Sequence, residues 1–189
     1  MASTAPGPDG LAGDFPGDPD GFERLWTPHR MIYLDGQDKP ATSEAGPQCP
    51  FCRAPEGRDA DGLIVARGET CYVVLNLYPY NSGHVMVCPY RHVSLYPDLT
   101  PAETVELATL TQQAMRVITG EYACHGFNLG MNQGAVAGAG IAAHLHQHVV
   151  PRWGGDSNFL PIVAQTKALP ELLADTRRRL AAAWQVAPA

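Results

Sequence analysis

The sequence predicts one α+β domain in which helices pack against an antiparallel sheet. Its 189 residues are 45% hydrophobic and 17% charged, which is the composition of a globular domain with its own core. Short β-branched and aromatic runs alternate with two segments of helical periodicity. The first three runs are joined by short turns, which only antiparallel neighbours allow. This pattern favours the α+β class over parallel-sheet architectures.

Residues 1–22 are predicted to form a disordered acidic tail rich in Gly and Pro. They hold 4 Asp, 5 Gly and 4 Pro, and no Lys or Arg. Such a stretch cannot bury enough apolar surface to offset the entropy lost on ordering. The folded domain is expected to span residues 23–189, beginning with an N-terminal arm anchored by Leu25 and Trp26. Residues 35–48 are again polar and are expected to form a loop.

Three strands are expected between residues 63 and 88. Residues 63–67 and 71–75 are β-branched or aromatic runs that Gly68 interrupts. Residues 84–88 follow the turn signal Asn81-Ser82-Gly83, and Pro89 is expected to end this third strand.

A helix is expected over residues 101–119. Thr100 suits the N-cap, Pro101 suits the first helical position, and Glu103 completes a capping box. Gly120 is expected to end this helix. Two strands, 126–132 and 145–150, and a C-terminal helix over about 170–185 complete the expected elements.

Charge and hydropathy exclude several classes of function. The formal net charge is −6, of which the tail contributes −4, and the sequence pI is about 5.6. These values argue against a surface for duplex nucleic acid. No apolar run is long enough to cross a bilayer, and the N-terminus lacks the features of a secretory signal. A cytoplasmic protein without a disulfide framework is expected.

Three histidines alternate along one predicted strand. His144, His146 and His148 stand at i, i+2 and i+4, so their imidazoles share a face. Two chemistries fit three convergent imidazoles: a catalytic metal with an open position, or attack by a neutral imidazole on an electrophile. The glycine-rich stretch 134–140 just upstream is a candidate anion cradle, because small residues let backbone N–H groups approach phosphate oxygens. This glycine-rich stretch favours the second chemistry, in which His146 acts as a nucleophile.

Cys49 and Cys52 have the spacing of a zinc knuckle. Two thiolates need two further ligands to complete a tetrahedron. No second cysteine pair lies nearby, so histidines are the natural completion. A site closed by four protein ligands would have a structural role, because it leaves no position for water.

The segment His144-Leu145-His146-Gln147-His148-Val149-Val150 resembles the signature of the histidine triad (HIT) superfamily of nucleotide hydrolases and transferases. That signature alternates histidines with apolar residues, and Gln147 is the spacer that departs from it. The resemblance covers about residues 47–165 and implies a HIT-like fold.

Three further segments strengthen the resemblance. Residues 76–84 resemble the family's ribose-contacting asparagine followed by a Gly-His strand start, and residues 132–138 resemble its phosphate loop. The flanks at 26–31 and 151–159 are typical of the branch that includes diadenosine tetraphosphate phosphorylases. The resemblance therefore implies dinucleoside polyphosphates as substrates, although phosphoramidates and nucleotidyl sugars share the same α-phosphate chemistry.

The resemblance implies that His146 attacks the α-phosphorus and forms a nucleotidyl-histidine, which inorganic phosphate or water then resolves. It implies that His148 and His84 orient or neutralise the phosphates. The other nucleotide- or phosphate-binding residues that it implies are Asn76, Asn132, Gln133, Gly138, Ala139, Gly140 and Trp153. The phosphorylase branch tends to carry Gly-Ser where this chain has Ala139 and Gly140, so phosphorolysis and hydrolysis both stay open.

Relatives with a matching cysteine pair resemble galactose-1-phosphate uridylyltransferase in completing a zinc site with two histidines. The matching positions here are His92 and His144, which implies a structural zinc bound by Cys49, Cys52, His92 and His144. A homodimer is typical of the family and is expected. Two alternatives remain: a metallohydrolase that uses His144, His146 and His148 as metal ligands, and a nucleotide-binding module without catalysis.

Overall fold

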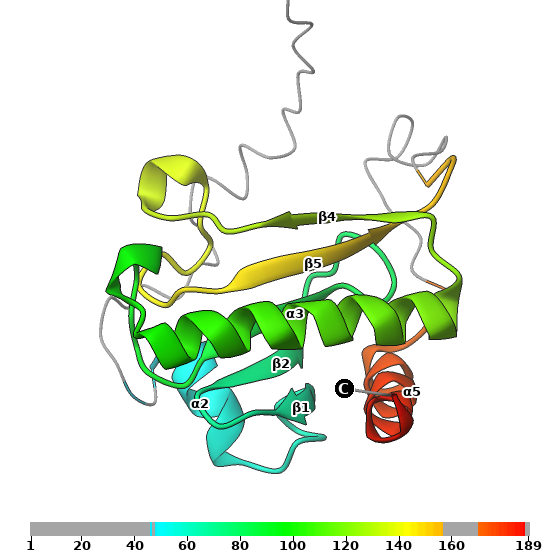
Figure 1. Ribbon diagram of the computed structural model, residues 1–189, viewed down its shortest axis with the longest axis horizontal. Coiled ribbons are helices and arrows are strands. Elements are labelled where there is room, and N and C mark those ends of the chain that lie inside the picture. Colours follow the sequence, from blue (N-terminus) through cyan, green and yellow to red (C-terminus); the bar gives the residue numbers. More distant parts are fainter. Residues whose placement is uncertain (1–45, 47, 157–169, 188–189) are drawn as a thin grey trace, which may run out of the picture. The chain divides into compact units, whose positions relative to one another are not determined.

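The computed structural model describes residues 46, 48–156 and 170–187. In this part of the chain, five strands form one antiparallel sheet in the order β1-β2-β3-β5-β4, together with three α-helices (Figure 1). The strands are β1 (Ile64–Arg67), β2 (Cys71–Leu75), β3 (Val85–Pro89), β4 (Gly126–Gly130) and β5 (Gln147–Arg152). The helices are α2 (Pro50–Arg53), α3 (Pro101–Tyr122) and α5 (Leu173–Val186), with short 3-10 turns at Ala54–Glu56, Tyr96–Asp98 and Ala135–Ala137. The predicted α+β class with an antiparallel sheet is confirmed.

The predicted tail and N-terminal arm, and the flanking motif beyond Asp156, lie outside the described residues. None of the helices in the described ranges is long and apolar enough to cross a membrane.

Helix α3 begins where the sequence predicts and ends later. The Glu103 N–H donates to Oγ1 of Thr100 at 3.2 Å, and the Thr100 N–H donates to the Glu103 carboxylate at 2.7 Å. This reciprocal pair confirms the capping box. The prediction that Gly120 ends the helix is wrong, because the helix continues to Tyr122 and Ala123 forms the left-handed C-cap at φ 47°. Gly120 is exposed, where glycine weakens a helix by only about 1 kcal/mol relative to alanine.

The strand boundaries differ from expectation by one or two residues. Strand β3 includes Pro89, which was expected to end it, because Pro89 stands opposite Cys71 as the last pair of the β2–β3 ladder. Strand β4 stops at Gly130, and β5 begins at Gln147 rather than residue 145. His144 and His146 therefore lie in the segment that leads into β5, and only His148 lies within the strand. The Leu145 N–H donates to the Val93 carbonyl at 2.6 Å and holds this leading segment alongside the chain after β3.

Alternate side chains of the sheet enter two different cores. One core combines the helices α3 and α5 with sheet residues such as Val73, Val87 and Val149. The other lies on the opposite face and packs Cys49 and Phe51, at the start of α2, against Val74 and Met86. Because His148 stands opposite Met86 in the β3–β5 ladder, its side chain points to the α2 face. The α2 face is thus where the site is built.

Candidate functional site

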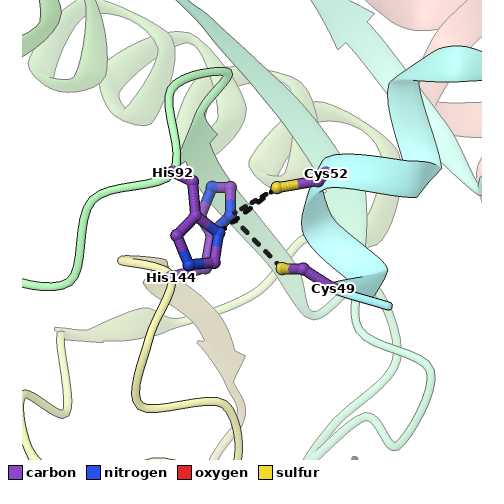
Figure 2. A group of neighbouring side chains, drawn as sticks. All are labelled: Cys49, Cys52, His92 and His144. Carbon is purple, nitrogen blue, oxygen red and sulfur yellow. Dashed lines mark hydrogen bonds between the residues drawn. The ribbon is translucent and has the colours of Figure 1, made fainter. Parts of the chain in front are cut away.

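Two cysteines and two histidines from three separate segments converge at the start of α2 (Figure 2). The Sγ atoms of Cys49 and Cys52 each lie 3.5 Å from Nδ1 of His144. The Cys52 Sγ atom also lies 3.3 Å from Nδ1 of His92. All four potential ligand atoms lie within 4.8 Å of one another. The fold therefore brings together the four residues that were predicted to bind a metal, and the cluster could hold one.

The spacing of this cluster fits a tetrahedral zinc ion. Zn–S bonds of about 2.3 Å and Zn–N bonds of about 2.0–2.1 Å would place sulfur and nitrogen about 3.6 Å apart. Burial raises the pKa of the Cys49 thiol, so a thiolate at this position needs a cation nearby. Within the described ranges no other group of three or more potential ligands is found, and His146 and His148 are not part of this one. This grouping argues against the alternative of a three-histidine metal site.

The hydrogen bonding of His144 leaves its Nδ1 atom able to bind a metal. Its Nε2 atom lies 2.9 Å from the Pro89 carbonyl oxygen. A carbonyl can only accept, so Nε2 carries the proton and Nδ1 carries the lone pair that faces the two sulfurs. Burial, and then the charges of His92 and His146, lower the pKa of His144 to about 4, so the ring is neutral at pH 7. A carbonyl that fixes the second nitrogen of a histidine ligand is common at protein metal sites.

The hydrogen bond of His146 decides which of its two nitrogens carries the lone pair. Its Nδ1 atom lies 2.8 Å from the main-chain carbonyl of His144, so Nδ1 donates and Nε2 holds the lone pair. Burial lowers the pKa of His146, which keeps the ring neutral at neutral pH. No group in the described part of the chain makes a hydrogen bond to Nε2. A neutral, oriented imidazole with one available lone pair is what nucleophilic catalysis by histidine requires.

A chain of hydrogen bonds makes His148 a donor beside His146. The Tyr80 N–H donates to Nδ1 of His84 at 3.0 Å, so the proton of the neutral His84 ring is on Nε2. That nitrogen lies 3.0 Å from Nδ1 of His148, which therefore accepts. Burial, and then the charge of His146, lower the pKa of His148 to about 4, so the ring is neutral and its proton is on Nε2. The rings of His146 and His148 lie 5.0 Å apart at 75°, so the two imidazoles are side by side.

Asn76 shapes the loop between β2 and β3. Its Oδ1 atom accepts from the Tyr78 N–H at 3.0 Å, and its Nδ2 atom lies 3.4 Å from Nδ1 of His84. The buried Asn81 ties the same loop to the end of β5, because its Nδ2 atom lies 2.8 Å from the Pro151 carbonyl. The structure thus places Asn76 beside the histidine chain, and its contact with a ribose stays a prediction.

The predicted phosphate loop runs from Asn132 to Gly140. Asn132 is half-buried, whereas Gln133 already has a partner, because its Oε1 atom accepts from the Tyr96 N–H at 2.8 Å. Gly138 has a φ of 78°, a left-handed conformation that favours glycine. Ala139 is buried, and Gly140 is half-buried. Phosphate binding by Asn132, Gln133, Gly138, Ala139 and Gly140 stays a prediction.

Trp153 occupies a different place from the histidines. It follows β5, where odd-numbered positions such as Gln147 and Val149 face α3, and its Nε1 atom donates to the Tyr122 carbonyl at 3.2 Å. This contact anchors the end of β5 to the C-terminal end of α3. Among the described residues the partner of the indole N–H is thus Tyr122 rather than a histidine, and the role of Trp153 at the base stays a prediction.

Two aromatic residues at the site were missed by sequence reasoning. The Phe51 ring lies 4.8 Å from the ring of His146, and the Tyr80 ring lies 4.8 Å from the ring of His84. Tyr80 also stacks on His148 at 5.8 Å and 20°. Both residues stand inside motifs whose other positions carried the chemistry, between the two cysteines and between Asn76 and His84. That location was the only available signal, because an isolated aromatic residue has no periodicity.

Comparison with known proteins agrees with this geometry. The HIT domain family matches residues 58–155. A Mycobacterium tuberculosis protein named AP-4-A phosphorylase is 52% identical over 174 residues, covering 91% of this chain and 89% of the relative. A Schizosaccharomyces pombe protein named bis(5'-nucleosyl)-tetraphosphatase [asymmetrical] is 37% identical over 93 residues, covering 49% of this chain and 50% of the relative.

A solved structure shares the fold. The crystal structure of a zinc-bound histidine triad family protein from Mycobacterium smegmatis superposes with a TM-score of 0.59 at 26% identity, covering 72% of this chain and 93% of that one. The family match spans about half of the chain, and the tuberculosis relative aligns with nearly all of it. The chain belongs to the HIT domain family.

Proposed function

We propose that the chain cleaves diadenosine tetraphosphate, or a closely related dinucleoside polyphosphate, by transferring a nucleotidyl group through His146. The observation that carries this proposal is the tautomer of His146. Its Nδ1–H donates to the His144 carbonyl at 2.8 Å, so Nε2 keeps its lone pair. The M. tuberculosis relative that is 52% identical is named AP-4-A phosphorylase, which supports the choice of substrate.

The reaction has two steps. In the first, the Nε2 lone pair of His146 forms a bond to the α-phosphorus, and the bond from that phosphorus to its bridging oxygen breaks. The leaving nucleoside polyphosphate takes the electron pair, and Nε2–H of His148 donates a hydrogen bond to the departing oxygen. In the second, an oxygen of the acceptor attacks the same phosphorus and the N–P bond breaks, which returns the lone pair to His146; when the acceptor is water, its proton is released to the solvent. Two easier displacements thus replace one difficult one.

The substrate contacts come from groups around these two rings. We propose that Asn76 holds the ribose, that His84 keeps His148 in its donor tautomer, and that the loop from Asn132 to Gly140 supplies backbone N–H donors to the phosphates. The positive φ values of Gly134 and Gly138 support the last assignment, because such backbone turns form concave sites for anions.

We propose that zinc occupies the cluster of Cys49, Cys52, His92 and His144. Two thiolates and two imidazoles at tetrahedral spacing suit zinc, and the M. smegmatis relative is zinc-bound. Four protein ligands leave no open position, so zinc would supply folding stability there and no activated water.

We also propose that the protein is a homodimer located in the cytoplasm. The edge position of β4, where Leu129 is exposed, supports a second copy as the neighbour.

The acceptor is proposed to be inorganic phosphate, in line with the name of the tuberculosis relative. The missing serine hydroxyl at Ala139–Gly140 favours water as a competitor. Incubation of the protein with diadenosine tetraphosphate, with and without phosphate, separates the two. ADP plus ATP that forms only with phosphate means phosphorolysis, and AMP plus ATP without phosphate means hydrolysis. Absence of cleavage under both conditions, in zinc-loaded protein, would refute the proposed substrate.

A further inference from the structure

Phe51 connects the start of α2, where Cys49 and Cys52 lie, to the proposed nucleophile His146. It stands between Cys49 and Cys52 and is buried, with 7% of its surface exposed. Its ring lies 4.8 Å from the ring of His146 at an interplanar angle of 35°. The same ring meets His144 edge-on at 5.5 Å and 61°. Both distances are within the range of favourable aromatic pairs.

His146 is held by its neighbours on several sides. The His144 carbonyl fixes Nδ1 and the His148 ring lies against it edge-on, which limits translation of the ring. Rotation about the bond from Cβ to the ring could still turn Nδ1 away from the His144 carbonyl, which holds its proton, and put Cε1 in the place of Nε2. The Phe51 ring lies against the imidazole and hinders this rotation, because the two rings would have to separate.

Phe51 is itself fixed by the core beneath it. Its carbonyl oxygen accepts from the hydroxyl of Tyr72 at 2.6 Å, and Tyr72 is fully buried. The cysteines on either side of Phe51 lie in the cluster with His92 and His144. The start of α2 therefore cannot move without breaking the hydrogen bond from Tyr72 or the contacts among the four cluster residues.

We infer that Phe51 is a positioning residue of the reaction, which holds the His146 imidazole in the orientation that presents Nε2 to the substrate. This inference rests on the proposed function. It assigns a second role to the start of α2, beside the proposed zinc binding by Cys49 and Cys52. Loss of the ring would lower kcat, because misorientation of a reacting group slows chemistry. KM would change little, because Phe51 is not among the residues proposed to contact the ribose or the phosphates.

The test uses Phe51→Leu, which removes the flat ring but keeps an apolar side chain. The aromatic contact predicts a fall in kcat of about three- to ten-fold, with KM within about two-fold of the wild type. Phe51→Tyr, which keeps the ring, should restore most of kcat. Phe127→Leu is the matched control, because Phe127 lies on β4 and packs in the core on the α3 face. That variant should lose stability but keep kcat.

A second measurement does not depend on turnover. Nitrogen-15 NMR of the imidazoles in zinc-loaded protein reports which nitrogen of His146 carries the proton. The wild type and Phe127→Leu should show one tautomer protonated at Nδ1, whereas Phe51→Leu should show a mixture at an unchanged zinc content. A single Nδ1-protonated tautomer in Phe51→Leu would overturn the inference, as would an equal loss of kcat in the control. Absence of dinucleotide cleavage by the wild type would refute the proposed function and leave the NMR comparison valid.

Discussion

Replacement of Glu103 by Gln should destabilise the protein in a pH-dependent way. The Glu103 carboxylate accepts from the Arg91 guanidinium at 2.7 and 2.9 Å and from the Thr100 N–H at 2.7 Å. It therefore caps α3 and fixes Arg91, which immediately precedes the metal-ligand candidate His92. The Glu103 side chain is only 6% exposed but that of Arg91 is 47% exposed, so water screens the ion pair in part and the magnitude below is an upper value.

The magnitude follows from the pKa of Glu103. The hydrogen bonds from Arg91, against the opposing effect of burial and with help from Thr100, lower this pKa from 4.5 to about 2. That difference corresponds to about 3 kcal/mol of stability at neutral pH. A glutamine keeps part of the hydrogen bonding, and neutral bonds are about half as strong as charged ones. The expected loss of unfolding free energy in Glu103→Gln is therefore about 2 kcal/mol.

The pH dependence has a definite sign. Because the folded pKa lies below the unfolded one, the stabilisation is complete above 4.5 and is lost as the pH falls toward 2. Urea unfolding of both proteins at about pH 7 and about pH 2.5 measures the difference between them. Release of any bound metal at low pH should affect both proteins alike and cancel in that difference. An equal gap at both pH values, or none at neutral pH, would refute the reasoning.

Four further substitutions probe the metal site, the contact between α3 and β5, and the turn between β1 and β2. Cys52→Ser should abolish zinc binding measured by elemental analysis and lower the unfolding temperature, and an unchanged zinc content would contradict the assigned ligands. Thr111→Val should lower the free energy of unfolding by about 1–3 kcal/mol, because the Gln147 amide that donates to Thr111 Oγ1 at 2.7 Å loses its acceptor. Gln147→Leu should lower it by about 1 kcal/mol or less, because no donor is then left unpaired. The reverse order in urea unfolding would contradict this. Gly68→Ala should lower the free energy of unfolding by about 1–3 kcal/mol, because the Cβ of alanine would collide with the Glu106 carboxylate. A variant as stable as the wild type would show that this turn can shift.

Local patterns predicted the fold well. The capping box at Thr100 and Glu103 appears in the structure because both partners lie within one helical turn. The end of α3 was misplaced, because helix continuation past Gly120 depends on tertiary packing near residues 117–122 rather than on the glycine itself. Such packing leaves no mark in the local sequence.

The metal-ligand candidates were predictable and the details of the histidines were not. Thiolate spacing and family resemblance identified the four residues that the structure brings together. The period-two pattern placed His146 and His148 on one face, but it could not reveal that Nδ1 of His146 meets the His144 carbonyl. The partner of Gln147 was equally hidden: this departure from the apolar pattern faces α3 and meets the hydroxyl of Thr111.

Identification of the modified histidine tests the role of His146 most directly. Zinc-loaded protein is mixed with diadenosine tetraphosphate without phosphate, quenched under alkaline conditions that preserve N–P bonds, and digested for fragment-ion mass spectrometry. We expect one AMP group on His146, and none on the same peptide of the His146→Asn variant at an unchanged zinc content. An AMP group on His148, or turnover by His146→Asn at the wild-type rate, would contradict the proposed nucleophile.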